Sequence, residues 1–84
     1  MEYIIQNIEP KRPGHSNRHR GLWIGRKCEI DLLMVGTHGR LVVEVEDDEW
    51  HRIITTPVLS CEMREVGIVF ETENSVYTLA KESI

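Results

Sequence analysis

Apolar and polar side chains alternate along much of this 84-residue sequence. Residues 27–34, 41–46 and 68–73 each follow a period of two. This period places successive side chains on opposite faces of a β-strand, whereas an amphipathic helix repeats every 3.6 residues. The sequence therefore predicts an all-β domain whose strands each turn one face toward the core.

Turn-forming residues separate the alternating segments at short intervals. Glycines lie at positions 36 and 39, four adjacent acids at 46–49, and an Asn–Ser pair at 74–75. The expected strands are residues 3–8, 27–34, 41–46, 50–56 (extended past Pro57 by 58–61), 68–73 and 76–79, with 22–24 as a short apolar strand or turn. Closing such a meander removes its exposed edges. We expect a small five- or six-stranded antiparallel barrel or meander, SH3-like, with a two-sheet sandwich as the alternative.

The chain is expected to form one small domain, residues 1–84, because a chain of this length buries only roughly 60% of its unfolded surface. Residues 10–21 contain prolines, glycines and cations but no hydrophobic side chain. This segment cannot join a core, so it is expected to be a mobile basic loop. Residues 80–84 are expected to form a frayed tail.

Charge is distributed unevenly along the chain. Residues 11–27 contain six cations and no acid, on a chain whose net charge is −4. The six cations are Lys11, Arg12, Arg18, Arg20, Arg26 and Lys27. A short cationic segment on an acidic chain attracts anionic groups of a partner.

This segment suggests a non-enzymatic protein–protein interaction module, or a small subunit of an assembly. The six cations would steer a partner and Trp23 would be the apolar anchor. Self-association is a second form of the same hypothesis, because the acidic turn at 46–49 has the opposite charge. The alternative is binding of single-stranded nucleic acid or RNA, in which the cations contact phosphates and Trp23 stacks on a base.

The two cysteines and two tryptophans are candidate core residues. Cys28 and Cys61 are far apart in the sequence and form no CxxC pair, so they are expected to be small buried thiols rather than a disulfide. Trp23 and Trp50 are expected in the core, with each indole N–H hydrogen-bonded at the rim. An exposed Trp23 would instead mark a binding surface.

Metal binding and catalysis find little support. His15, His19 and Cys28 lack the two tight ligand pairs of a structural zinc site, so no metal or other cofactor is expected. Cys61 is followed by acids that oppose thiolate formation. No glycine-rich phosphate loop is present. The sequence therefore predicts no enzyme activity and no small-molecule substrate.

The expected location is cytoplasmic. No apolar run approaches the roughly 18 residues of a membrane helix. The first six residues also lack the basic flank and apolar length of a secretory signal. No association with a membrane is expected.

Overall fold

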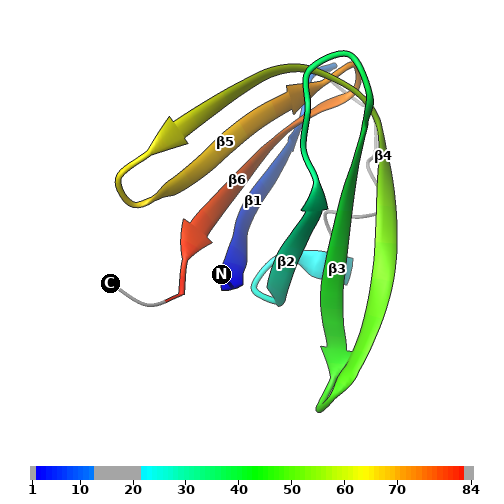
Figure 1. Ribbon diagram of the computed structural model, residues 1–84, viewed down its shortest axis with the longest axis vertical. Coiled ribbons are helices and arrows are strands. Elements are labelled where there is room, and N and C mark those ends of the chain that lie inside the picture. Colours follow the sequence, from blue (N-terminus) through cyan, green and yellow to red (C-terminus); the bar gives the residue numbers. More distant parts are fainter. Residues whose placement is uncertain (1, 13–21, 83–84) are drawn as a thin grey trace.

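The computed structural model describes residues 2–12 and 22–82. Six antiparallel strands form a closed barrel in which each strand lies beside its neighbours in sequence (Figure 1). The strands are β1 (Glu2–Pro10), β2 (Lys27–Leu32), β3 (His38–Glu46), β4 (Glu49–Arg64), β5 (Gly67–Thr72) and β6 (Ser75–Lys81). The prediction of a small antiparallel SH3-like barrel is confirmed.

The barrel closes between its first and last strands. β1 pairs with β6 from Tyr3↔Lys81 to Pro10↔Ser75, with one bulge after Ile5. On its other side β1 pairs with β2 only along residues 2–4. The ladder to β6 therefore provides most of the hydrogen bonding that holds β1 in the barrel.

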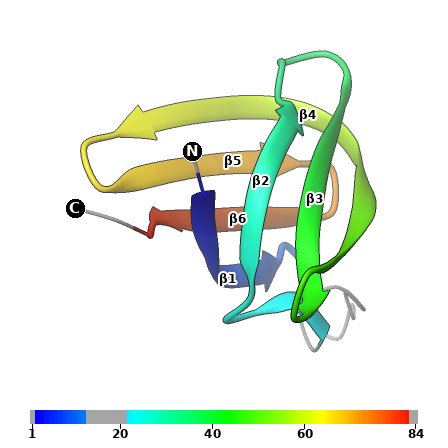
Figure 2. The same ribbon diagram turned by 60° about the horizontal axis from the view of Figure 1, so that its bottom comes forward.

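One long strand, β4, belongs to both halves of the barrel. Its first part pairs with β3 as far as Pro57, and its second part pairs with β5 from Val58 onward. Figure 2 shows β4 curving continuously between these two partners. At the changeover the Val58 N–H donates to the Thr37 carbonyl at 2.9 Å. Pro57 lacks an N–H, and a bulge beside it is a usual place for a strand proline. The expected extension past Pro57 is therefore confirmed, and it passes through a bulge within one strand.

Side chains from all six strands fill the barrel. The Phe70 and Tyr77 rings stack at a centroid distance of 4.7 Å with 5° between their planes. The buried hydrophobic core consists of Tyr3, Ile5, Ile8, Cys28, Leu41, Val43, Ile53, Val58, Ile68, Phe70, Tyr77 and Leu79. Cys28 is buried as expected, Cys61 is half-buried, and both are free thiols.

Some expected boundaries are wrong. β6 continues through Lys81, so the first two residues of the expected 80–84 tail are strand residues. β1 includes Pro10, which was expected to open the basic loop. β2 ends at Leu32, and Met34 is exposed in the turn that follows. Residues 13–21, most of the expected mobile loop, lie outside the part of the chain described here.

The two tryptophans differ in their surroundings. Trp23 lies in a short helical turn, packs against the core and is half-buried. Its indole Nε1 is buried without a hydrogen-bond partner among residues 2–12 and 22–82, contrary to the expected bond at the rim. Trp50 is half-buried opposite Glu44, outside the core cluster. The expectation of a core position is therefore wrong for Trp50.

Candidate interaction surface

Two of the predicted binding cations are paired with acids of the barrel. The Lys11 ammonium forms an ion pair with the Glu71 carboxylate, and Lys27 Nζ lies 3.0 Å from Glu82 Oε1. The hydrogen bond that Lys27 donates to Glu82 raises the pKa of Lys27 above its ordinary value. Lys11 likewise lowers the pKa of Glu71. Charges that are separated in the sequence are therefore brought together in the fold.

The predicted cations do not form one patch in the described part of the chain. Lys27 pairs with Ile4 near the start of β1, whereas Lys11 follows Pro10 at its end. Arg12 is exposed. Arg18 and Arg20, like His15 and His19, lie outside the described residues. Their part in binding stays a prediction.

Arg26 holds the turn that precedes β2. Its Nη1 donates to the Val45 carbonyl at 2.6 Å, and its Nε donates to the Leu22 carbonyl at 3.2 Å. Gly25 makes the turn possible with a φ of 90°, a conformation in which glycine carries no steric penalty. Leu22 and Ile24 are exposed on this turn, while Trp23 faces the core.

The outer face of β5, β6 and β1 carries no charge over two adjacent rows of residues. Ile4 pairs with Ala80, which pairs with Gly67; Asn7 pairs with Thr78, which pairs with Val69. On β1, Gln6 lies at the bulge between the row that contains Ile4 and the row that contains Asn7. We call this area the uncharged face, and it consists of Ile4, Gln6, Asn7, Gly67, Val69, Thr78 and Ala80. It ends at the next row, where Glu9 and Glu71 flank Val76.

The outer face of β2, β3 and β4 has the opposite character. Glu29 pairs with Val42, which pairs with Arg52. The Asp31 carboxylate lies 3.9 Å from Arg40 Nε and 3.8 Å from Arg52 Nη2. This charged face is typical of a strand surface that remains in water.

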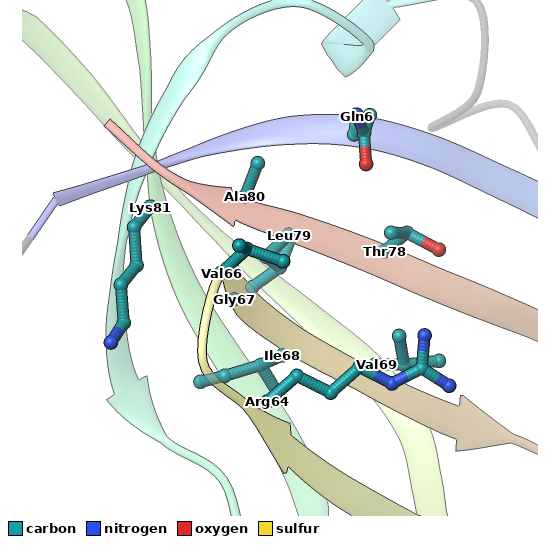
Figure 3. A pocket seen from close by; sticks show the side chains of 10 residues that line it. All are labelled: Gln6, Arg64, Val66, Gly67, Ile68, Val69, Thr78, Leu79, Ala80 and Lys81. Atoms are coloured by element: carbon teal, nitrogen blue, oxygen red, sulfur yellow. The ribbon is translucent and has the colours of Figure 1, made fainter. Parts of the chain in front are cut away.

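A groove lies on the uncharged face beside the β4–β5 hairpin (Figure 3). Its volume is about 290 Å³, and Gln6, Thr78 and Val69 line it from three adjacent strands. The groove is hollow because Gly67 has no side chain and Ala80 has a single methyl group. Arg64 and Lys81 also line it and bring two cations to a largely apolar depression.

The tip of the β4–β5 hairpin projects from the barrel (Figures 1 and 2), and its Arg64 and Val66 line the groove. Met63 and Val66 are 69% and 61% exposed, the highest values for large hydrophobic side chains in residues 2–12 and 22–82. Between them, Arg64 Nη2 lies 3.0 Å from Glu62 Oε2, and this hydrogen bond lowers the pKa of Glu62. The tip thus combines exposed apolar groups with charges of both signs.

Both thiols of the barrel have raised pKa values. Burial raises the pKa of Cys28 to about 12, and it also raises the pKa of Cys61. His38 Nδ1 lies 2.7 Å from the Thr55 carbonyl. Within residues 2–12 and 22–82, no three His, Cys, Asp or Glu side chains come together as a metal site. No helix in that part of the chain is long and apolar enough to cross a membrane.

We found no match to this chain among protein-family models, curated proteins or solved structures. Function is therefore inferred from the surface chemistry of the barrel.

Sequence reasoning missed the uncharged face, although the sequence contains a signal for it. Residues 3–8, 66–70 and 76–80 each run for five or six positions without a charge. A strand with one face in water normally carries polar residues at alternate positions, so an uncharged run predicts a strand with both faces covered. The barrel order then places these three strands side by side.

Proposed function

We propose that this protein is a non-enzymatic protein-interaction module that binds a protein partner through the uncharged face. The observation that carries the proposal is the contrast between the two outer faces of one barrel. The face of β5, β6 and β1 lacks charge over two rows, while that of β2, β3 and β4 carries paired acids and arginines.

Desolvation energy explains why this contrast points to a partner. Charged side chains lose hydration when another protein covers them, and an exposed ion pair returns only about 0–1 kcal/mol. The centres of protein interfaces are accordingly depleted of charged residues. Covering Val69, Thr78 and Ala80 removes no charge from water, so this face is the less costly one to bury.

Cations lie at both ends of the uncharged face, where Arg64 is paired with Glu62 and Lys11 with Glu71, so Lys81 and Arg12 are the better suited to a steering role. Arg64 and Lys81 line the groove at one end, and Lys11 and Arg12 follow β1 at the other. Positive charge at the rim of an interface raises the rate of encounter with an acidic partner more than it raises affinity. The remaining cations of the predicted arm, Arg18 and Arg20 in particular, would extend the same steering field.

The engagement of the described cations supports a protein partner over a nucleic acid. Lys11 and Lys27 are paired with acids, and Arg26 is bonded to two backbone carbonyls. Phosphate binding would first have to break these contacts. Nucleic-acid binding through the basic segment remains the alternative hypothesis.

A matched pair of variants tests the proposal. Thr78→Glu adds a carboxylate to the centre of the uncharged face, and Val42→Glu adds one at a half-buried outward position of the charged face. Tagged versions of the wild type and both variants are compared for co-purifying proteins in the native cells, and each candidate is then titrated by calorimetry. We expect Thr78→Glu to weaken direct binding at least about tenfold and Val42→Glu to leave it unchanged. Equal affinity for both variants would contradict the proposal.

A further inference from the structure

We propose that the partner on the uncharged face is a second copy of this chain, held in a two-fold dimer. In this dimer the tip of each β4–β5 hairpin enters the groove of the other copy. This inference rests on the proposed function and names its partner.

The first argument is shape. The hairpin tip presents Val66 as an exposed apolar knob, and the groove beside it is hollow at Gly67 and Ala80. Val66 itself lies on the groove wall, so knob and hollow are adjacent on one surface (Figure 3). A two-fold axis between them lets each copy insert its knob into the other's hollow.

The second argument is charge. The hairpin and groove carry both signs: Arg64 is paired with Glu62 within one copy, whereas Glu65 and Lys81 have no ion pair among the residues described. A two-fold interface uses the same patch on both copies, so a self-complementary patch needs cations and anions together. The charged residues at this tip meet that requirement around an apolar centre.

The position of the knob also decides the type of assembly. A knob and a hollow on opposite sides of a molecule produce open chains or fibres, whereas neighbours on one patch permit a closed pair. Because Val66 and the groove share one patch, we expect assembly to stop at two copies. The charged face of β2, β3 and β4 would remain in water.

Sedimentation velocity of the purified protein tests the dimer. We expect the sedimentation coefficient to rise with concentration in the micromolar to millimolar range, from one copy to two and no further. Val66→Arg should raise the dissociation constant at least about tenfold. Val35→Arg, which alters a similarly exposed valine in the β2–β3 turn, is the matched control and should leave the dissociation constant unchanged. Circular dichroism checks that both variants fold.

A mixed disulfide locates the contact. Val66→Cys and Thr78→Cys are prepared as separate proteins, each in a Cys61→Ser background, then mixed and oxidised. We expect the mixed dimer to form faster than when Val35→Cys replaces Val66→Cys. Equal crosslinking by position 35, or a dimer that survives Val66→Arg, would overturn the inference.

The two proposals fail in different ways. A protein that stays monomeric throughout, yet loses a different protein partner in Thr78→Glu, refutes the dimer and keeps the interaction face. If the protein stays monomeric and Thr78→Glu changes its affinity for none of its partners, both proposals are refuted.

Discussion

Gly67 lies so close to the carbonyl oxygen of Leu79 that a Cβ atom at position 67 would overlap it. The contact joins β5 to β6 at the point where the groove begins. Residue 67 pairs with Ala80 in the same ladder. Glycine is therefore required here by the approach of the neighbouring backbone, and the hollow beside it follows from that requirement.

Gly67→Ala should destabilise the barrel more than Gly36→Ala does. At position 36 a Cβ meets nothing within 4 Å, and the cost is only that of a φ of 94°, about 1–2 kcal/mol. At position 67 the backbone of Leu79 must move. Urea unfolding of the two variants measures the difference in stability. Equal urea midpoints would show that β5 and β6 can move apart at position 67 without a larger loss of stability.

Acid should weaken the barrel partly through Glu71. Its hydrogen bond and ion pair with Lys11 lower the pKa of this carboxyl below the ordinary 4.5. A lowered pKa in the folded state gives stability that is present above pH 4.5 and is lost as the pH falls through the lowered value. Glu71→Gln should therefore show a flatter decline of melting temperature below pH 4.5 than the wild type.

Glu73→Gln is the control for that titration, because Glu73 is exposed in the β5–β6 turn and forms no ion pair with the residues described. Its acid decline should match that of the wild type. If Glu71→Gln also matched the wild type, the Lys11–Glu71 pair would not contribute to stability in solution.

The two thiols should differ in reactivity. Cys28 is fully buried with a pKa of about 12, whereas Cys61 is only half-buried, and burial raises its pKa as well. We expect iodoacetamide to alkylate Cys61 in the folded protein and to reach Cys28 only through unfolding. Mass spectrometry of the labelled protein against time distinguishes the sites, with Cys61→Ser as the control. Equal labelling rates in the folded state would show that β2 opens locally.

Nucleic acid should bind weakly and only at low salt. An amide NMR titration with a short mixed-sequence single strand should move residues 11–27 at low salt and cause no shifts at moderate salt. The Arg18→Ala/Arg20→Ala double variant should abolish the low-salt shifts. Saturable binding at moderate salt would instead favour the nucleic-acid hypothesis. In that case the logarithm of the binding constant should fall with the logarithm of the salt concentration, with a slope of about 0.7 per phosphate contacted on a single strand.

Alternation was enough to predict the barrel, because it identifies strands wherever one face is in water. It failed where another rule decided the boundary. The strand continues past Pro57 as expected, but the change of partner from β3 to β5 at the proline was not predicted. Ala80 and Lys81 looked like a tail, but Tyr3 and Ile4 provide their ladder partners from the opposite end of the sequence.

The interaction surface was harder to predict, because charge along a sequence differs from charge in space. Lys11 and Lys27 seemed to belong to one cationic arm, yet each lies beside an acid from β5 or the chain end. Trp23 seemed available as an anchor, yet its ring packs against the core. Only the barrel order shows that the uncharged runs share one face.

The pairing of β1 with β6 over most of its length has a consequence for how the molecule forms. Every other ladder joins strands that follow each other in the chain, so those hairpins can arise early from local contacts. β1 obtains its main partner only when the last strand arrives, and such distant pairing places folding in the range of milliseconds to seconds. During synthesis, edges of β1 and β5 stay open until residues 75–81 leave the ribosome, and in that interval the chain is most exposed to aggregation.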